Sequence, residues 1–190
     1  MKSSLKTNLQ KRPTREELAQ AAGGEMPDII ALNLRVLFCG INPSVYSVVV
    51  GHHFARPGNR FWKALFNSGF TPHLFKPEED FSLPDFGLGI TNIAPRATVA
   101  AAELSLDELR EGGIILREKV IRFAPKHLAV LGIGAYRTAF EKPKATFGEQ
   151  SETVGKTRLW VLPNPSGLNA HYQPADLARL FAEMRFDAEE

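Results

Sequence analysis

The 190-residue sequence contains a single cysteine and lacks any long hydrophobic run, and these two features exclude several classes of protein. A single thiol, Cys39, cannot form an internal disulfide, and it cannot supply a zinc or iron–sulfur site that needs several cysteines. The longest apolar runs, such as 45–50 with its internal Ser47, are too short to span a bilayer. The Lys-rich start lacks the apolar stretch of a signal peptide. We therefore expect a cytoplasmic protein with no membrane partner.

Several common catalytic and cofactor motifs are also missing. The sequence contains neither a Gly-x-x-x-x-Gly-Lys phosphate loop nor a Gly-x-Ser-x-Gly nucleophile turn. The Gly-Ile-Gly fragment at 132–134 lacks the third glycine of a dinucleotide fingerprint, so a tight strand-to-helix turn explains it better. His52 and His53 are adjacent rather than spaced as a helical metal pair, and no nearby Asp, Glu or Cys adds ligands. The sequence therefore predicts no metal and no cofactor.

The composition is that of an ordinary globular protein. The net charge is +2, hydrophobic residues make up 44% of the chain and charged residues 23%, which argues against disorder, collagen and coiled coils. The length suits one α/β domain. We expect residues 1–30 to be a basic, poorly ordered extension with one short helix, begun by a capping box of Thr14 and Glu17. Residues 31–190 are then expected to form a single domain.

Asp and Glu are missing from two segments, residues 29–77 and 153–175. In the first segment Arg56, Arg60 and Lys63 lie close together in a stretch that is not predicted to be core. Chance, or a core that excludes charge, is one explanation of these gaps. The other is that the two segments meet around an anionic ligand, because the absence of carboxylates lowers the repulsion of phosphates.

Strands and helices alternate along the rest of the chain. The expected strands are 34–39, 87–93, 127–131 and 158–162, with a hairpin turn at 155–156 before the last of them. The expected helices are 59–66, 105–123, 135–141 and 175–186, with a break allowed at Gly112 and Gly113 and a long loop at 41–58. This order predicts a three-layer α/β/α fold around a mostly parallel sheet.

Two loops directly after predicted strands contain the same tripeptide, Asn-Pro-Ser, at 42–44 and 164–166. Ligands of open α/β sheets bind beyond the carboxyl ends of the strands, where both loops would lie. Proline restricts the backbone of the preceding residue, so the amides of Asn42 and Asn164 would be held there as donors and acceptors. An ordinary turn is the alternative for each tripeptide, because these are turn residues.

Four motifs together resemble the mismatch-specific uracil/thymine-DNA glycosylases, the G/U and G/T mismatch branch of the uracil-DNA glycosylase superfamily. They are Gly-Ile-Asn-Pro-Ser at 40–44, Phe-Ala-Arg-Pro-Gly-Asn-Arg-Phe-Trp at 54–62, Gly-Ile-Thr-Asn-Ile at 89–93 and Pro-Asn-Pro-Ser-Gly-Leu at 163–168. The resemblance implies a uracil-DNA glycosylase-like fold and a DNA repair enzyme. Such an enzyme flips uracil, or thymine, from a mismatch and hydrolyses the N-glycosidic bond without a lyase step. The implied partner is double-stranded DNA with a mismatched or damaged base, at the nucleoid in a bacterium. We expect a monomer.

The resemblance also implies roles for individual residues. Asn42 matches the catalytic Asn, which orients the attacking water. The implied base pocket consists of Ile41, Ser44, Phe54, Asn92 and Asn164, with the Phe54 ring stacked on the flipped base. The implied DNA wedge and guanine contact consists of Gly167, Leu168 and Asn169. The candidate phosphate contacts are Arg56, Arg60, Lys63, Ser166 and His171.

Three positions depart from the family pattern. Ser44 stands where glycine is usual, and its hydroxyl would either narrow the pocket or add a hydrogen bond. Asn169 and Ala170 replace the usual Ser-Arg, with His171 as the substitute cation. Asn92 lacks the carboxylate that could act as a second catalytic group. These departures affect substrate range more than reaction class.

Two other functions compete with a glycosylase. One is a non-catalytic DNA- or nucleotide-binding protein on the same fold, and the other is a hydrolase of free nucleosides. Retention of Asn42, Phe54 and Asn164 favours the enzyme over the binding protein. Leu168 beside Gly167 favours duplex DNA over free nucleosides, because apolar wedges unstack base steps.

Overall fold

A five-stranded sheet forms the centre of the computed structural model, which describes residues 12–189. The strands are β1 (Val36–Gly40), β2 (Leu88–Asn92), β3 (His127–Leu131), β4 (Gly148–Val154) and β5 (Thr157–Leu162). Their order across the sheet is β2-β1-β3-β5-β4. All neighbours pair in parallel except β4, which pairs antiparallel with β5 after the predicted hairpin turn. The predicted mostly parallel sheet is thus confirmed.

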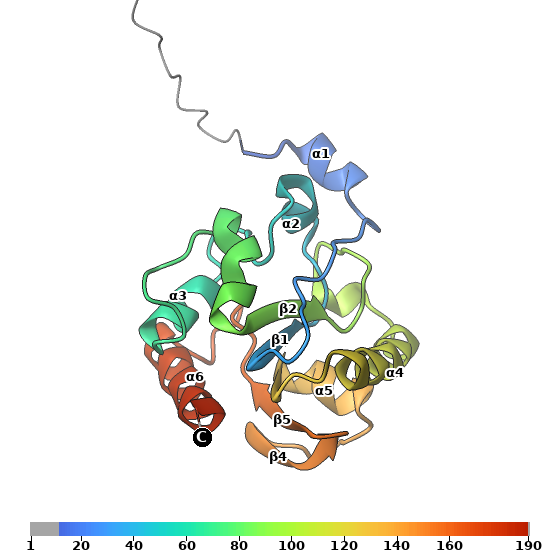
Figure 1. Ribbon diagram of the computed structural model, residues 1–190. Coiled ribbons are helices and arrows are strands. Elements are labelled where there is room, and N and C mark those ends of the chain that lie inside the picture. Colours follow the sequence, from blue (N-terminus) through green and yellow to red (C-terminus); the bar gives the residue numbers. More distant parts are fainter. Residues whose placement is uncertain (1–11, 190) are drawn as a thin grey trace, which may run out of the picture.

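Helices cover both faces of this sheet (Figure 1). The α-helices are α1 (Arg15–Gln20), α2 (Val45–Val50), α3 (Phe61–Asn67), α4 (Leu106–Phe123), α5 (Ile133–Ala139) and α6 (Pro174–Glu189). Two 3₁₀ segments are η1 (Pro77–Phe86) and η2 (Ala101–Glu103). The predicted helices near α3, α4, α5 and α6 are confirmed within a few residues. None of the helices between residues 12 and 189 is long and apolar enough to cross a bilayer.

Alternate residues of the central strands enter two separate cores. In β1, Phe38 packs with α3, η1 and α6 on one face, while Leu37 and Cys39 pack with α4 and α5 on the other. A strand buried on both faces must be apolar throughout, which explains the unbroken hydrophobic run that predicted β1. The result is the three-layer α/β/α architecture expected from the sequence.

Gly112 and Gly113 do not break α4, contrary to the break that the sequence allowed. Both glycines are buried, and a Cβ atom on either would overlap a backbone carbonyl, that of Ile93 or of Ala139. Their lack of a side chain therefore lets α4 lie close to the end of β2 and to α5. The helix is instead fixed at its start, where Ser105 and Glu108 form the predicted capping box.

The predicted loop at 41–58 contains a helix that the sequence analysis missed. Ser44 caps α2 by accepting a hydrogen bond from the Ser47 N–H at 3.1 Å, and Gly51 ends it with φ 78°. Six residues rich in valine show no helical periodicity and have low helix propensity, so the sequence carried little signal. The cap and the packing of buried Val45 and Ser47 stabilise the helix instead.

The described part of the predicted extension is more closely attached than expected. Thr14 and Glu17 form the predicted capping box of α1, which lies beside α2 (Figure 1). Farther on, Ile29 forms an antiparallel bridge with Ile90 of β2, and the Gly23 N–H donates to the Ala97 carbonyl at 2.9 Å. The segment thus contacts the sheet edge at Ile29 and the loop after β2 at Gly23. The division at residue 30 stays a prediction, and residues 1–11 lie outside the described part.

Candidate active site

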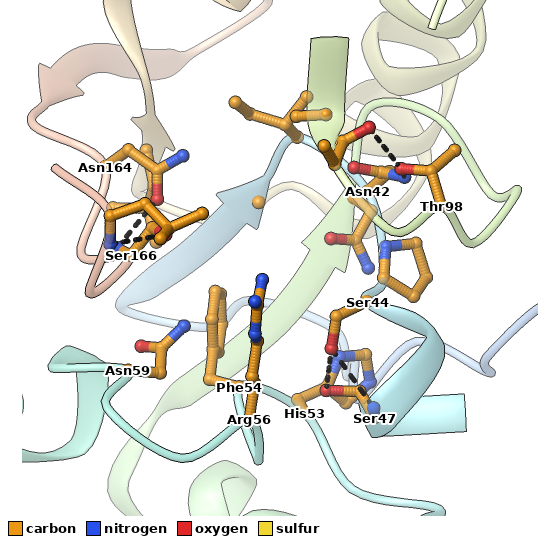
Figure 2. A pocket seen from close by; sticks show the side chains of 18 of the residues that line it. Asn42, Ser44, Ser47, His53, Phe54, Arg56, Asn59, Thr98, Asn164 and Ser166 are labelled. Carbon is orange, nitrogen blue, oxygen red and sulfur yellow. Dashed lines mark hydrogen bonds between the residues drawn. The ribbon is translucent and has the colours of Figure 1, made fainter. Parts of the chain in front are cut away.

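A cavity of about 350 Å³ opens where β1, β2 and β3 end (Figure 2). Both Asn-Pro-Ser loops border it, as predicted for the carboxyl edge of the sheet. The sequence-predicted residues that line it are Ile41, Asn42, Ser44, Phe54, Arg56, Asn92, Asn164, Ser166, Leu168 and Asn169. The others, Arg60, Lys63, Gly167 and His171, lie outside its lining.

The amide of Asn42 is fixed by two acceptors from a single loop. Its Nδ2 donates to the Arg96 carbonyl at 2.9 Å and to the Thr98 hydroxyl at 2.7 Å. A carbonyl can only accept, so the amide orientation is unambiguous. With both N–H bonds committed, the Asn42 Oδ1 is the atom left to accept a hydrogen bond from a molecule in the cavity.

Thr98 lines the cavity and contacts Asn42, and the sequence analysis missed it. Its hydroxyl donates to the Ala100 carbonyl at 2.9 Å, so its lone pairs are available to accept from Asn42 (Figure 2). The neighbouring Arg96 forms a 2.7 Å ion pair with Glu108 at the start of α4. Hydrogen bonds from Arg96 and from the Ser105 N–H lower the pKa of Glu108 to about 2. The segment that orients Asn42 is thereby anchored to α4.

Phe54 supplies a flat apolar wall in a strained backbone conformation. Its φ is 52°, in the left-handed region that a bulky residue rarely occupies, and its ring stacks on Phe61 with centroids 4.0 Å apart. The preceding residue, His53, is held by its backbone: its N–H donates to Asp80 at 2.9 Å, and its carbonyl accepts from the Trp62 indole at 3.3 Å. These buried partners stabilise the unusual turn.

The burial of His53 favours the neutral form of its side chain. Burial lowers its pKa, and its Nε2 lies 3.0 Å from the Pro27 carbonyl, so Nε2 carries the proton.

Gly40, at the end of β1, occupies a position where a side chain would not fit. A Cβ atom there would collide with the Asn92 side-chain oxygen and touch the Phe54 ring. The absence of a side chain at Gly40 thus leaves room for Asn92 and Phe54 to line the cavity.

Ser44 uses its hydroxyl for structure rather than for the cavity. The oxygen caps α2 and lies 3.1 Å from the Ser47 hydroxyl, which in turn accepts from the Ala55 N–H. Of the two roles that the sequence left open for this hydroxyl, the structure shows an added hydrogen bond within the protein. The Ser44 backbone has φ −79°, so the position does not itself require glycine.

We expect Ser44→Gly to lower the free energy of unfolding by only a few tenths of a kcal/mol, and Ser44→Ala by about 1 kcal/mol. Glycine exposes the first N–H groups of α2 to water, whereas alanine covers them without accepting a hydrogen bond. Urea denaturation of the three proteins measures both differences. An unchanged free energy of unfolding in Ser44→Ala would mean that the cap contributes little, and a larger loss in Ser44→Gly than in Ser44→Ala would mean that the packing of Cβ matters instead.

The second Asn-Pro-Ser loop offers the cavity a hydrogen-bond donor, where the first loop offers an acceptor. The Asn164 Oδ1 accepts from the Ser166 N–H at 3.0 Å, in a turn closed by its own side chain, and its backbone carbonyl accepts from the Asn169 amide at 3.0 Å. The Nδ2 of Asn164 is the group that remains for the cavity (Figure 2). The cavity therefore has an acceptor on one wall, from Asn42, and a donor on another.

The predicted wedge lies at the tip of this second loop. Leu168 is 73% exposed, so it is not a loop leucine tucked into the core. Gly167 is exposed beside it, and Asn169 is half-buried. A large apolar side chain this exposed at the edge of a cavity contributes little packing in the free protein.

The hydrogen bonds of Arg60 disagree with the prediction that it contacts phosphate. Its guanidinium donates to the backbone carbonyls of Tyr172, Ser166 and Asn169 at 2.5, 2.6 and 2.8 Å. The other predicted cations, Arg56, Lys63 and His171, are exposed, and of these Arg56 lines the cavity. Arg60 must therefore be removed from the candidate phosphate contacts, because its donors serve the chain itself.

The described residues offer little support for metal-dependent chemistry or for a reactive thiol. Between residues 12 and 189, no three His, Cys, Asp or Glu side chains lie together as a metal site would require. Cys39 is fully buried in β1, and burial raises the pKa of its thiol far above the usual value. A thiol with this burial stays protonated and inert, as expected for a packed core residue.

Comparisons with known proteins agree with this geometry. Residues 27–185 match the sequence model of the uracil DNA glycosylase superfamily. A similar solved structure is the solution NMR structure of a proposed uracil DNA glycosylase from Methanosarcina acetivorans, with a TM-score of 0.54 and 16% sequence identity. The similarity covers 87% of this chain and 98% of that one, and at this identity it shows the fold alone.

Proposed function

The chain belongs to the uracil DNA glycosylase superfamily, and on that premise we propose that it is a monofunctional DNA repair glycosylase acting on mismatched uracil. Thymine opposite guanine is the second candidate substrate. The observation that carries the proposal is the oriented Asn42 amide, whose free oxygen faces a cavity that Phe54 also lines. The four motifs of the mismatch branch support the choice of substrate.

The proposed reaction begins with base flipping, because the glycosidic bond cannot be reached inside a duplex. The flipped uracil stacks on Phe54. The Asn42 Oδ1 accepts a hydrogen bond from a water molecule and aims the water oxygen at C1′ of the sugar. As the bond from C1′ to the base nitrogen breaks, its electron pair leaves with uracil, and the water oxygen forms the new bond to C1′. The water proton is then lost to solvent.

Asn42 contributes orientation rather than proton abstraction. An amide oxygen is too weakly basic to take a proton, so the rate depends on a good leaving group and on the oxocarbenium character of the sugar. In the proposed reaction the Asn164 Nδ2 and backbone N–H groups around Ile41 and Ser44, all residues that line the cavity, stabilise the negative charge that develops on uracil. This division of work explains why a pocket without a carboxylate at Asn92 can still be catalytic.

The function is tested with labelled duplexes that carry G·U, G·T or A·U pairs and with single-stranded uracil DNA. We expect strand breaks only after alkaline treatment, because a monofunctional enzyme leaves an intact abasic strand, and we expect G·U to react fastest. Tight binding of the duplexes without excision from any of them would favour the non-catalytic binding protein. Release of uracil from free nucleosides but not from DNA would favour the nucleoside hydrolase.

We expect the affinity for a G·U duplex to fall about tenfold or more between roughly 50 and 200 mM salt. Exposed Arg56 and Lys63, in a region without carboxylates, motivate this expectation, because each phosphate contact releases a counterion. Fluorescence anisotropy on the wild type and on the alanine variant of each residue measures the salt slope. An affinity that is flat over this range would show that no phosphate-binding surface exists.

A further inference from the structure

We propose that Arg60 is a positioning residue that holds the wedge loop, residues 165–172, in the shape needed to enter a duplex. The proposal rests on the proposed function, because it concerns how the enzyme flips a base. It assigns Arg60 to the specificity for duplex DNA rather than to chemistry or to phosphate binding.

One residue makes four hydrogen bonds to this loop. The backbone N–H of Arg60 donates to the Pro165 carbonyl at 2.9 Å, directly before α3 begins. The guanidinium donates to the carbonyls of Ser166, Asn169 and Tyr172 at 2.6, 2.8 and 2.5 Å. Hydrogen bonds from a charged donor are stronger than neutral ones, and a planar fork can reach several acceptors at once.

Little else fixes the exposed part of the loop. Leu168 is 73% exposed, and its N–H makes only a long bond, 3.3 Å, to the Ser166 hydroxyl. Asn169 makes the shorter internal bonds, to Ser166 and Asn164 at 3.0 Å. A Cβ atom on Gly167 would lie 2.6 Å from the Gly58 carbonyl, so the loop rests on the segment that leads to Arg60. The two ends of the loop are packed, since Pro165 is buried and Tyr172 contacts Phe147 and the core. Arg60 therefore holds the exposed middle of the loop from the inside.

The four hydrogen bonds from Arg60 to the wedge loop, which we call the clamp, have an electrostatic consequence as well as a mechanical one. A carbonyl oxygen aimed at the Arg60 guanidinium cannot also face a DNA phosphate. Drawing three carbonyls inward thus removes partial negative charge from the side of the loop that meets DNA.

A pre-shaped loop matters because flipping is costly. Unstacking a base step costs a few kcal/mol, and the inserted side chain offsets part of that cost. A loop that samples many conformations must be ordered during insertion, which reduces the energy available from Leu168. A single strand leaves no vacancy in a base stack to be filled, so the same loss of order should matter little there.

Arg60→Lys separates a clamp from a phosphate contact. Lysine keeps the positive charge, but its compact ammonium group cannot span carbonyls from residues 166, 169 and 172. We expect single-turnover excision from a G·U duplex to fall about tenfold, excision from single-stranded uracil to stay within about twofold, and the salt slope to stay unchanged. Near-wild-type activity of Arg60→Lys, with a smaller salt slope for Arg60→Ala, would overturn the proposal in favour of a phosphate contact.

A double-mutant cycle tests whether Arg60 acts through the wedge. In a Leu168→Ala background, Arg60→Lys should cause little further loss on the duplex, because the side chain that the clamp positions is already gone. Fully additive losses would contradict the proposal. Arg179→Ala is the matched control, since Arg179 is exposed on α6 and pairs only with Glu183 among the interactions described.

Hydrogen–deuterium exchange supplies a measurement that does not depend on activity. We expect the amides of residues 167–172 to exchange faster in Arg60→Lys than in the wild type, with the rest of the protein unchanged. Unchanged exchange in this loop would refute the clamp, even if the enzyme excises uracil. Faster exchange in the loop of a protein that excises no uracil would instead refute the proposed function and leave the clamp standing as a structural fact.

Discussion

Asn42→Ala is expected to lower single-turnover excision of uracil from a G·U duplex by about a hundredfold or more. The side chain lies on a loop after β1 and is partly exposed, so its removal should leave the melting temperature and duplex affinity close to those of the wild type. The loss falls on the chemical step, because water loses the acceptor that aims it at C1′. Rapid-quench excision, an anisotropy titration and a thermal melt measure the three quantities.

Thr98 provides a matched pair of controls for this prediction. Thr98→Val keeps the shape but removes the oxygen that accepts from Asn42, whereas Thr98→Ser keeps the hydroxyl. We expect the valine variant to be slower by about tenfold, because one of the two bonds that orient the amide is lost, and the serine variant to be near wild type. An unchanged excision rate in Asn42→Ala would remove Asn42 from the mechanism, and the order of the Thr98 variants would then carry no meaning.

The sequence predicted the two halves of this site for a clear physical reason. Each Asn-Pro-Ser tripeptide directly follows a strand buried on both faces, and parallel strands end at one edge of a sheet. Asn42 and Asn164 were therefore expected at the same edge of the sheet once the strands were identified. That they line one cavity depends on the strand order, in which β3 alone separates β1 from β5. Their complementary polarity was not predictable, because it depends on which amide atoms are used elsewhere, by Thr98 for Asn42 and by Ser166 for Asn164.

The residues that sequence reasoning misplaced or missed are those whose positions depend on tertiary contacts. Thr98 lies beyond β2, and the parallel pairing of β1 with β2, continued by a bridge between Ser44 and Thr98, brings it to Asn42. Arg60 belongs to an acid-free basic cluster, which indicates phosphate binding, yet three carbonyls of a loop about a hundred residues away bind its guanidinium. A local pattern records the charge of a side chain but not the direction in which the fold turns it.

Leu168→Ala is expected to lower excision from a G·U duplex by about tenfold or more, and excision from single-stranded uracil by no more than about twofold. Leu168 is 73% exposed in the free protein, so truncation removes almost no buried surface and the melting temperature should barely change. The effect arises only in the flipped state, where the leucine fills the place of the extruded base. A shorter side chain leaves that place partly empty, so the base returns to the stack more often.

Two measurements made side by side decide the role of Leu168. Single-turnover excision on both substrates gives the ratio of duplex to single-strand activity, and a thermal melt reports the fold. Leu168→Met is the matched control, because methionine has a similar volume and should retain most of the duplex activity. Equal losses on the two substrates would place Leu168 in the base pocket instead of the wedge. A large drop in melting temperature would show that it packs against the protein, and the flipping device would then have to lie elsewhere along the DNA-facing loops.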